Sequence, residues 1–594
     1  MNAQKLKAGE KPGFFLNYKK VKGQKFLWQI APADLKESLR ISNEHNLSLS
    51  VANILFSRGY SDKKDVSSFL FVSKEKNVHD PKLFKDSDLV LVRLLKAIDK
   101  KERILIFGDY DVDGITSTSL LLLAFLPLGA NINFFLPNRK KDGYGLSAKI
   151  VQKAFDNKYD LIITVDNGIT AFEAADLAYT LGVDLIITDH HRPLQTAPKA
   201  LGIIDANQDD CSYPYKDLAG VGTIFKMVCM VYEQKKLDLP DKVYELLLLG
   251  TVADVAPLTG ENRYWVKYGL SKVNKKRSLA LNVLMQNSRL AKSRIDSLDI
   301  GFMIAPQINA LGRLDDPRQA VQFLISSDQH LVEQIGLKLK QINEERKKID
   351  NRIYLDIETA ILERRIDLEK ENIIIAASSD WPAGVIGLVA GRLAQNYGKP
   401  SILFHMDKKG TLKGSCRSIP EFNIFNALNA NKDLLIKFGG HSFAAGLQLH
   451  KDKLPEFKVR LEELIKKEVD PADLIPKIKI DTSLDLTELN SSFLSELEKL
   501  EPFGNSNEQP VFVIENVTLQ GLPQILKEKH VKCFVFSNGI LKPVIFFNRP
   551  ELYSFFNNLG DRSFDLAAYV TKNEWNGRIN IELQGIDIAL KDEL

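Results

Sequence analysis

The hydrophobic pattern between residues 50 and 270 alternates between short strand-like runs and longer helix-like stretches. The strand-like runs cover residues 104–107, 132–136, 161–165, 185–188 and 202–204. Short apolar runs with helical stretches between most of them are typical of βαβ units. We therefore expect a mostly parallel sheet covered by helices.

A helical pattern follows between residues 331 and 370. Turn-forming residues are rare there, and apolar residues recur at helical spacing, among them Ile335, Leu339, Ile342, Ile353 and Ile357. This spacing predicts one long amphipathic helix, or two in series, that joins two domains. An ordinary helical hairpin fits the same pattern.

The last part of the chain contains two further patterns. Strand-like runs at residues 373–376 and 402–404 indicate a second α/β domain, and Pro471 and Pro476 mark its end. Five strand-like runs follow Pro510, at residues 511–514, 531–536, 544–547, 566–570 and 579–583. Several short strands in succession predict a small barrel or a sandwich.

These changes of pattern divide the chain into five segments. They are an N-terminal extension (1–50), an α/β domain (51–330), a connecting helix (331–370), a second α/β domain (371–470) and a strand-rich domain (471–594). A chain of 594 residues is too long for a single hydrophobic core, which agrees with several domains. The expected fold class is α/β and multidomain.

Composition changes this picture only slightly. The net charge of +4 neither requires nor excludes nucleic acid, because local patches matter more than the total. The four cysteines form no Cys-x-x-Cys pair, which argues against a zinc site and fits a reducing compartment. No apolar run approaches the ~20 residues that span a bilayer, and the basic start has no signal-peptide core. We expect a cytoplasmic protein that does not contact membranes.

A basic cluster near the N-terminus is interleaved with aromatic residues. Its members are Lys19, Lys20, Lys22 and Lys25, with Tyr18, Phe26 and Trp28 beside them. Such a cluster could touch nucleic acid. An arm that packs on the next domain is the favoured interpretation.

Three carboxylates lie at alternate positions directly after the strand-like run at 104–107. They are Asp109, Asp111 and Asp113, in the sequence Asp-Tyr-Asp-Val-Asp-Gly. Such carboxylates repel one another where water is partly excluded, and a bound cation removes the repulsion. A loop after a strand is also where sites lie in open parallel sheets. A solvated turn with Asp caps explains this stretch equally well on its own, so partners are needed elsewhere in the chain.

Three more stretches offer such partners. They contain Asp166 after the run at 161–165, the triplet Asp189, His190 and His191 after the run at 185–188, and Asp254 within the apolar stretch 250–255. We interpret all of them as strand ends of one sheet. Mostly oxygen ligands with one or two imidazoles favour Mn²⁺ or Mg²⁺ over a thiolate zinc site. The five carboxylates of Asp109, Asp111, Asp113, Asp166 and Asp254 exceed the needs of one ion, so two ions are expected.

These stretches resemble the four successive motifs of the DHH phosphoesterase superfamily. The matching residues are 109–114, 165–168, 188–191 and 253–254. From about residue 50 to 590, the chain is similar to the RecJ branch of that superfamily. Residues 309–313, 384–387, 414–418 and 439–441 resemble later motifs of this branch. Pro382 departs from the pattern, because a His is expected there in many relatives.

The resemblance implies a fold and a set of residue roles. The fold is a parallel-sheet DHH domain and a DHHA1 domain joined by the long helix, with an OB-like barrel at the C-terminus. The implied metal ligands are Asp111, Asp113, Asp166, His190 and Asp254. Asp109 and Asp189 complete the implied catalytic set, with Asp109 binding the metals directly or through a ligand, and with His191 contacting phosphate.

The activity implied by the resemblance is single-stranded-DNA-specific 5′→3′ exonuclease activity. It would release 5′-mononucleotides by two-metal hydrolysis in DNA repair and recombination, with single-strand-binding protein and a helicase as candidate partners. Two other functions stay open: the same chemistry on an oligoribonucleotide or a dinucleotide, and a non-catalytic DNA-binding scaffold. The C-terminal barrel argues against the first, and the complete acidic set argues against the second.

Phosphate contacts are predicted from a separate argument. Arginine presents a planar fork that matches phosphate oxygens, and Arg139, Arg313 and Arg417 each lie in a motif-like stretch. Ser415 and Arg417 together offer a pocket for a terminal phosphate, although Arg417 could instead form an ion pair at a domain interface. The predicted substrate-binding set also contains Gly440 and His441. Most aromatics of the last domain should be core, with one or two exposed to stack bases; they include Phe534, Phe536, Phe546, Phe547 and Trp575.

Overall fold

The computed structural model describes residues 18–138, 142–143, 145–575 and 578–590. The chain forms two compact units. The sheet unit contains Phe71–Lys347 and Glu501–Glu508. The barrel unit contains the described residues up to Leu70, Lys348–Leu500, and the described residues from Gln509 onward. The expected α/β multidomain class is confirmed.

A five-stranded parallel sheet forms the centre of the sheet unit, in the order β4-β3-β5-β6-β7. Its strands are β3 (Arg103–Phe107), β4 (Asn131–Phe135), β5 (Leu161–Val165), β6 (Asp184–Thr188) and β7 (Gly202–Ile204). In the register of the sheet, Ile104 lies between Ile132 and Leu161. The five predicted strands and their parallel arrangement are confirmed.

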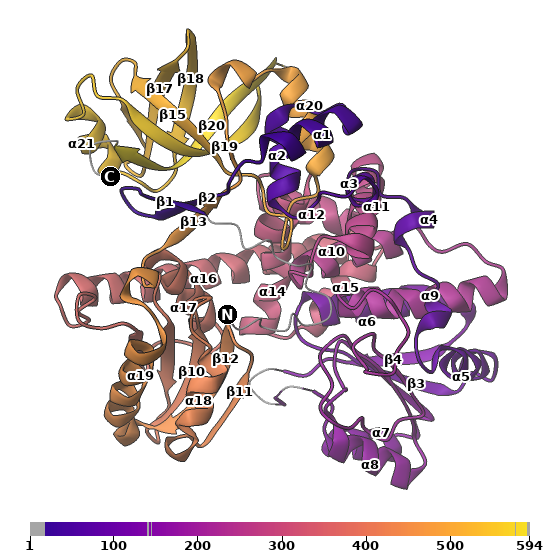
Figure 1. Ribbon diagram of the computed structural model, residues 1–594. Helices are drawn as coiled ribbons and strands as arrows, with labels where there is room; N and C mark the ends of the chain where they lie inside the picture. The colour runs from indigo at the N-terminus through magenta and orange to yellow at the C-terminus, as the bar shows by residue number, and fades with distance from the viewer. Residues whose placement is uncertain (1–17, 139–141, 144, 576–577, 591–594) are drawn as a thin grey trace. The chain divides into compact units, whose positions relative to one another are not determined.

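Side chains alternate across this sheet and build a hydrophobic core on each face. Leu105 and Ile162 belong to the core that includes α7 (Ala148–Asp156) and α8 (Phe172–Leu181), whereas Ile104 and Ile163 belong to a larger core. That larger core includes α5 (Ser87–Asp99), α6 (Val112–Phe125) and α9 (Gly220–Lys235). Burial on both faces explains why the strands are continuously apolar in the sequence. Figure 1 shows α7 and α8 beyond the sheet from α6 and α9.

One expectation about this unit is wrong, because residues 250–255 do not end a strand. Gly250 lies in the last turn of helix α10 (Lys242–Ala253), and Asp254 caps the C-terminus of that helix. Residues 246–251 of the helix are all buried. A helix buried on all sides has no polar face, so its sequence cannot be told from that of a buried strand by periodicity.

Further helices complete the sheet unit. They are α4 (Lys74–Asn77), α11 (Gly260–Lys275), α12 (Leu279–Asn287), α13 (Ser297–Asp299), the π-helix η3 (Ile300–Ile304), α14 (Ala305–Leu314) and α15 (Arg318–Ile325). The predicted connecting segment is one continuous helix, α16 (Gln329–Leu362), and not a hairpin. Its 34 residues extend over ~51 Å.

A mixed five-stranded sheet in the barrel unit has the order β11-β12-β10-β9-β8. Its strands are β8 (Ile374–Ser378), β9 (Ser401–Met406), β10 (Thr411–Arg417), β11 (Lys437–Gly440) and β12 (Ala444–His450). Helix α17 (Ile386–Tyr397) packs on β9 and β10. Phe404, Cys416 and Phe457 lie in the core, which extends to α18 (Ile424–Ala430) and α19 (Leu454–Glu468). The predicted second α/β pattern is confirmed.

Five strands of the C-terminal region close into a barrel. They are β15 (Phe512–Leu519), β17 (His530–Ser537), β18 (Ile540–Phe546), β19 (Phe564–Trp575) and β20 (Arg578–Leu590). The pairing of β15 with β17 closes the ring, which decides for a barrel over a sandwich. Strand β18 pairs with β20 in parallel, and α21 (Glu551–Asn557) connects β18 to β19. The short strands β14 (Thr482–Ser483) and β16 (Gln524–Leu526) extend the sheet, and α20 (Ser491–Leu500) precedes it.

The N-terminal segment forms a sheet with a strand from far along the chain. Strands β1 (Lys19–Lys22) and β2 (Leu27–Ile30) pair with β13 (Lys477–Ile480), and α1 (Leu35–His45), α2 (Leu49–Ser57) and α3 (Lys63–Leu70) follow. Trp28 is fully buried, and its Nε1 donates a hydrogen bond to Asp587 Oδ2 at 3.0 Å. The segment is therefore a packed arm, but it packs on the C-terminal barrel and not, as had been expected, on the next domain of the chain.

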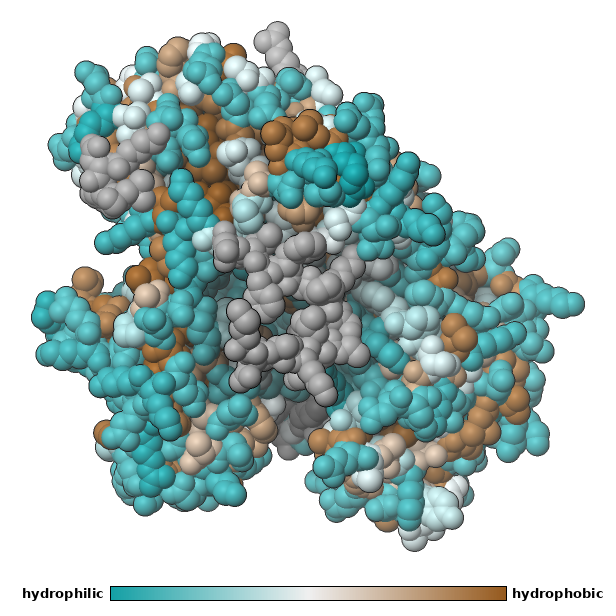
Figure 2. Space-filling model, viewed as in Figure 1, coloured by the Kyte–Doolittle hydropathy of each residue, from teal (hydrophilic) through white to brown (hydrophobic). Residues whose placement is uncertain are grey.

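The surface and the remaining elements add little to this picture. No helix among the described residues is long and apolar enough to span a membrane. The face drawn in Figure 2 is mostly hydrophilic, with hydrophobic residues interspersed.

Short 3₁₀-helices connect the larger elements: η1 (Pro81–Leu83), η2 (Leu126–Leu128), η4 (Lys432–Leu434), η5 (Lys451–Lys453), η6 (Pro471–Asp473) and η7 (Leu486–Glu488).

Candidate metal centre

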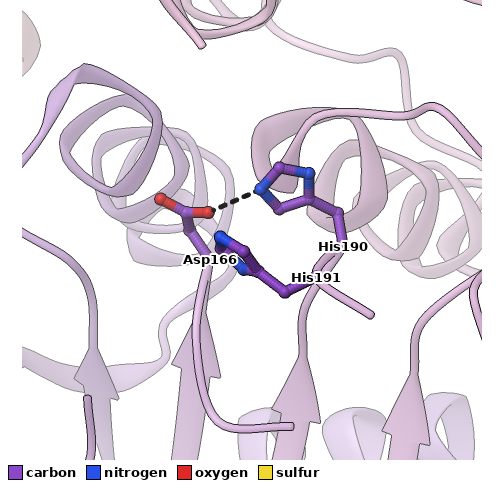
Figure 3. Close-up of side chains that lie close together, drawn as sticks. All are labelled: Asp166, His190 and His191. Carbon is purple, nitrogen blue, oxygen red and sulfur yellow. Dashed lines mark ion pairs between the residues drawn. The ribbon is translucent and has the colours of Figure 1, made fainter. Parts of the chain in front are cut away.

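The predicted acidic and imidazole groups converge at the carboxyl edge of the parallel sheet. Asp109 follows β3, Asp166 follows β5 and His190 follows β6, and these three strands are neighbours. The connection after β3 runs to β4 and the connection after β5 runs to β6, in opposite directions along the sheet, so the groups lie at a topological switch point. Figure 3 shows Asp166 at the end of one strand and both imidazoles on the loop of the next.

His190 lies at the centre of this group. Its Nε2 is 3.0 Å from Asp166 Oδ1 and 3.8 Å from Asp113 Oδ2. Its Nδ1 is 3.9 Å from Asp254 Oδ2, so the C-terminus of α10 brings Asp254 to the site. Although Asp254 does not end a strand, it joins the predicted cluster.

The ligand atoms form three overlapping groups of three: Asp109, Asp111 and Asp166; Asp113, His190 and Asp254; and Asp166, His190 and His191. Within each group the atoms lie within 4.8 Å of one another, and the first two groups share no member. Two groups without a shared member suit two neighbouring ions, each needing further ligands from water or substrate.

The N-terminus of α9 holds the Asp113 carboxylate. Gly220 N donates to Asp113 Oδ2 at 2.6 Å, and Val221 N donates to Oδ1 at 2.7 Å. Backbone N–H groups at a helix N-terminus favour negative charge. Position 220 must be glycine for a steric reason as well, because a Cβ there would lie 2.8 Å from the Asp166 Cβ and 3.1 Å from Asp113 Oδ2.

Helix α14 holds the acidic loop from another direction. Asn309 Oδ1 accepts a hydrogen bond from Val112 N at 3.2 Å. A Cβ on Gly312 would lie 2.1 Å from the Tyr110 carbonyl oxygen, so only glycine allows this close approach. The loop itself begins α6, since Asp111 Oδ1 accepts from Gly114 N at 3.1 Å.

Asp189 and His191 form a hydrogen-bonded pair beside the cluster. His191 Nδ1 lies 2.7 Å from Asp189 Oδ1, and Asp189 Oδ2 accepts from Ile169 N at 2.9 Å. Burial lowers the pKa of His191, but the hydrogen bond and charge of Asp189 outweigh it and raise that pKa to about 9. The short contact with Asp189 therefore favours the protonated imidazole.

The electrostatics of the cluster fit a cation. Burial and then the charges of neighbouring carboxylates raise the pKa of Asp113, Asp166 and Asp254 above the ordinary range. Burial and the neighbouring His191 lower the pKa of His190 to about 4, so its ring is neutral and keeps a lone pair for a metal. These buried groups would lose their mutual repulsion on binding divalent ions, and their donor set suits Mn²⁺ or Mg²⁺.

The predicted substrate-binding residues divide between the two units. Arg313 lies in the last turn of α14, in the sheet unit with the acidic cluster. Ser415, Arg417, Gly440 and His441 lie in the barrel unit. Arg139 and the side chain of Trp575 lie outside the described residues.

Ser415 and Arg417 share one face of β10, as the alternation in the sequence predicts. Arg417 Nη1 donates to Ser415 Oγ at 3.3 Å and to the Cys416 carbonyl at 2.7 Å. A Cβ on Gly387 would lie 2.7 Å from Ser415 Oγ and 3.3 Å from Arg417 Nη2, so the start of α17 closes tightly over this pair. Gly440 and Cys416 both lie opposite Ala445, which places Gly440 two strands from β10 at the same end of the sheet.

Sequence reasoning missed the residues that position the acidic cluster. Gly220 and Val221 were not predicted, although the run Ala-Gly-Val-Gly before an apolar helix at 219–222 is a Gly-rich helix start of the kind that binds anions. Asn309 and Gly312 belong to a predicted motif but received no role. Their partners are backbone atoms almost 200 residues away, and the residue types alone do not identify such partners.

Comparisons with known proteins agree with this architecture. Residues 103–251 match the DHH family, N-terminal domain; residues 370–467 match the DHHA1 domain; and residues 480–587 match the RecJ OB domain. The chain is 32% identical over 570 residues to the single-stranded-DNA-specific exonuclease RecJ of Bacillus subtilis, covering 96% of this chain and 71% of that protein. It is 34% identical over 512 residues to the RecJ of Salmonella typhimurium, covering 82% and 88%.

A solved structure has a similar fold over most of this chain. The crystal structure of RecJ in complex with Mn²⁺ from Thermus thermophilus matches with a TM-score of 0.78 at 26% identity, over 94% of this chain and 79% of that one. Another crystal structure of that protein is in complex with Mg²⁺. The fold and the acidic centre thus define a metal-dependent DHH-type phosphoesterase with an OB-like barrel domain. The chain belongs to the RecJ family.

Proposed function

We propose that this protein is a single-stranded-DNA-specific exonuclease that degrades strands in the 5′→3′ direction and releases 5′-mononucleotides. The observation that carries the proposal is the convergence of five carboxylates and the neutral His190 imidazole at one edge of the sheet. The family of the chain supports the nuclease activity and the single-stranded substrate. A role in DNA repair and recombination follows from that activity.

The metal ligands in this proposal are Asp111, Asp113, Asp166, His190 and Asp254, with Asp109 as a further carboxylate of the centre. When bound, divalent ions would act as Lewis acids on the phosphodiester and lower the pKa of a water. The N-terminus of α9 fixes Asp113 in position for this role, because both carboxylate oxygens accept backbone hydrogen bonds.

His191 is the proposed phosphate contact, and Asp189 orients it. The 2.7 Å hydrogen bond from Nδ1 fixes the ring plane, and Nε2 is the atom that would donate to a phosphate oxygen. Asp189 is itself fixed by three backbone N–H groups, those of Ile169, His190 and His191. Such a preorganised donor stabilises negative charge that develops on phosphate during hydrolysis.

Ser415 and Arg417 form the proposed pocket for the 5′-terminal phosphate. Both side chains lie on one face of β10 and are only half-buried, and the backbone of Gly387 approaches them closely. An arginine fork can give two parallel charge-assisted hydrogen bonds to a phosphate. Recognition of a terminal phosphate would set the direction of degradation. Arg139, Arg313, Gly440 and His441 complete the proposed contacts along the strand.

The barrel supports a polymeric substrate over a dinucleotide. Phe534 and Phe536 lie on the outward face of β17, with 36% and 38% of their surface exposed, whereas Phe546 is fully buried. Lys532 Nζ lies 5.8 Å from the centre of the Phe534 ring on the same face. Exposed aromatics beside a lysine are a platform on which bases stack without sequence preference.

The test is digestion of oligonucleotides labelled at either end. Single- and double-stranded DNA, single-stranded RNA and a dinucleotide are each incubated with Mn²⁺ and with Mg²⁺, next to the Asp166→Ala variant. We expect 5′-mononucleotides from single-stranded DNA only, and none from the variant. Preferred hydrolysis of the dinucleotide, or release from the 3′ end, would contradict the proposal.

We also propose that the protein acts in the cytoplasm, together with single-strand-binding protein and a helicase. The four cysteines are all free, as in a reducing compartment. A nuclease specific for single strands needs a reaction that separates the duplex, which a helicase supplies. Co-purification of the tagged protein with these partners from cell extract, after nuclease treatment, checks the association.

A further inference from the structure

The sheet formed by β1, β2 and β13 has one face covered by lysines. Its register places Lys20, Gln29 and Lys479 in one row and Lys22, Leu27 and Lys477 in the next. Because side chains alternate along each strand, these six residues share a face, which we call the lysine face. The register places no carboxylate on it.

The opposite face fixes the lysine face to the barrel. Val21, Trp28 and Ile480 lie in a core with Val513 and Ala567 of the barrel strands. Asp587 of β20 adds polar contacts, accepting hydrogen bonds from Phe26 N and Trp28 Nε1, both at 3.0 Å. The lysines are therefore mounted on a rigid extension of the barrel and not on a flexible arm. Figure 1 shows the three strands side by side next to the barrel.

Three of the four lysines are available for a ligand. Lys477 is neutralised, since its Nζ lies 2.6 Å from both Glu421 Oε1 and Asp473 Oδ1. Lys20, Lys22 and Lys479 are exposed and form no ion pair within the described part of the chain. Lysines two apart on a strand are ~7 Å apart, and lysines two strands apart are ~10 Å apart.

We propose that Lys20, Lys22 and Lys479 bind the phosphate backbone of single-stranded DNA outside the catalytic centre. This inference rests on the proposed function, because it takes single-stranded DNA as the substrate. Like charges kept on one rigid face repel one another, and a polyanion relieves that repulsion while releasing its condensed counterions. The contact is sequence-independent, since lysine meets phosphate as a point charge.

The test compares the triple variant Lys20→Gln, Lys22→Gln, Lys479→Gln with the wild type. Glutamine keeps most of the side-chain stem and removes the charge. Binding of a long oligo-dT is measured in EDTA over a range of salt concentrations. Each lost phosphate contact reduces the slope of log K against log salt by ~0.7, so we expect a loss of ~2 and at least about tenfold weaker binding at ~0.1 M salt.

A matched control separates this site from net charge. The control is the triple variant Lys149→Gln, Lys153→Gln, Lys158→Gln, which removes the same charge from exposed lysines on and after α7. It should keep the wild-type slope. Cleavage of a short oligonucleotide at saturation should be unchanged in both variants. The single variants Lys22→Gln and Lys479→Gln test the lysine face even if the triple variant does not fold. Each should have a slope lower by ~0.7 than the wild type.

The possible outcomes separate the inference from the proposed function. A wild-type protein that neither binds nor cleaves single strands would refute the proposed function. A wild type that does both, with a triple variant of equal affinity and slope, would refute the lysine face alone.

Discussion

Replacing Gly220 by alanine tests whether the start of α9 shapes the metal centre. A Cβ at this position would lie 2.8 Å from the Asp166 Cβ, 2.9 Å from Asp166 Oδ1 and 3.1 Å from Asp113 Oδ2. Carbon atoms in favourable contact are ~3.5–4.0 Å apart, so one partner must move by ~1 Å. Asp113 cannot move without losing its hydrogen bonds to Gly220 N and Val221 N. Asp166 can move only by changing its position relative to His190.

The size of the effect follows from these distances. A misplacement of ~1 Å in a catalytic constellation can cost ~100-fold in rate, or ~2.7 kcal/mol of transition-state stabilisation. Stability should change less, because overpacking costs ~1–3 kcal/mol while alanine gains ~1 kcal/mol over glycine in a helix. We therefore expect a folded Gly220→Ala protein with ~100-fold lower kcat/KM and weaker Mn²⁺ binding.

The matched control lies in the same helix. A Cβ on Gly222 would meet the end of the flexible Leu218 side chain at 3.3 Å, which can turn away. Hydrolysis of single-stranded DNA, Mn²⁺ affinity by calorimetry and a melting curve are measured for both variants. Wild-type turnover and metal affinity in Gly220→Ala, or equal losses in Gly222→Ala, would refute the steric argument.

Other substitutions probe separate parts of the molecule. Asp166→Ala should abolish hydrolysis and leave the protein folded, and EDTA should do the same to the wild type until Mn²⁺ is added. Arg417→Ala should remove the preference of kcat/KM for 5′-phosphorylated over 5′-hydroxyl strands without a change in metal content. Phe534→Ala and Phe536→Ala should each weaken binding of long single strands, by ~1–3 kcal/mol if the ring stacks on a base, as a fluorescence titration can show. Asp587→Ala should lower the free energy of unfolding in urea by ~3–5 kcal/mol, because it leaves the buried Arg549 and Trp28 Nε1 without this acceptor.

Two of these predictions have a matched control variant. Lys413→Ala removes another cation from β10 and should keep the phosphate preference; a preference retained in Arg417→Ala would remove that residue from the pocket. Leu522→Ala changes an exposed apolar side chain of the barrel domain and should leave affinity for long strands unaltered. Unchanged unfolding of Asp587→Ala would show that its hydrogen bonds contribute little.

The sequence was sufficient to predict the elements whose partners are close in the chain. The five strands of the parallel sheet follow from short apolar runs, and the acidic loop after β3 follows from the turn that must begin there. Each predicted strand of the barrel overlaps an observed one, although β15, β19 and β20 are longer than predicted. The run at 531–536 is nearly the whole of β17, in which buried residues alternate with less buried ones. Local periodicity carries this information because it reflects which face of each element is buried.

The failures concern positions whose environment is set by distant residues. Asp254 was assigned to a strand because α10 is buried on all sides and has no polar face. The backbone N–H of Gly220 donates to Asp113, which lies 107 residues earlier. Every residue type except proline has such an N–H group, so the residue type does not reveal this contact. The lysine face could not be predicted either, since its register depends on β13, which pairs with β2 from the other end of the chain.

That pairing also determines when the N-terminus can fold. Trp28 and its hydrogen-bond partner Asp587 are 559 residues apart. A ribosome that adds ~5–20 residues per second makes Asp587 between ~30 and ~110 seconds after Trp28. Until β13 is made, β1 and β2 have no third strand to complete their sheet, and until Asp587 is made, the Trp28 indole lacks its hydrogen-bond partner. This segment therefore becomes protected only long after it is made, so protease resistance of β1 and β2 reports that β13 and β20 have been synthesised.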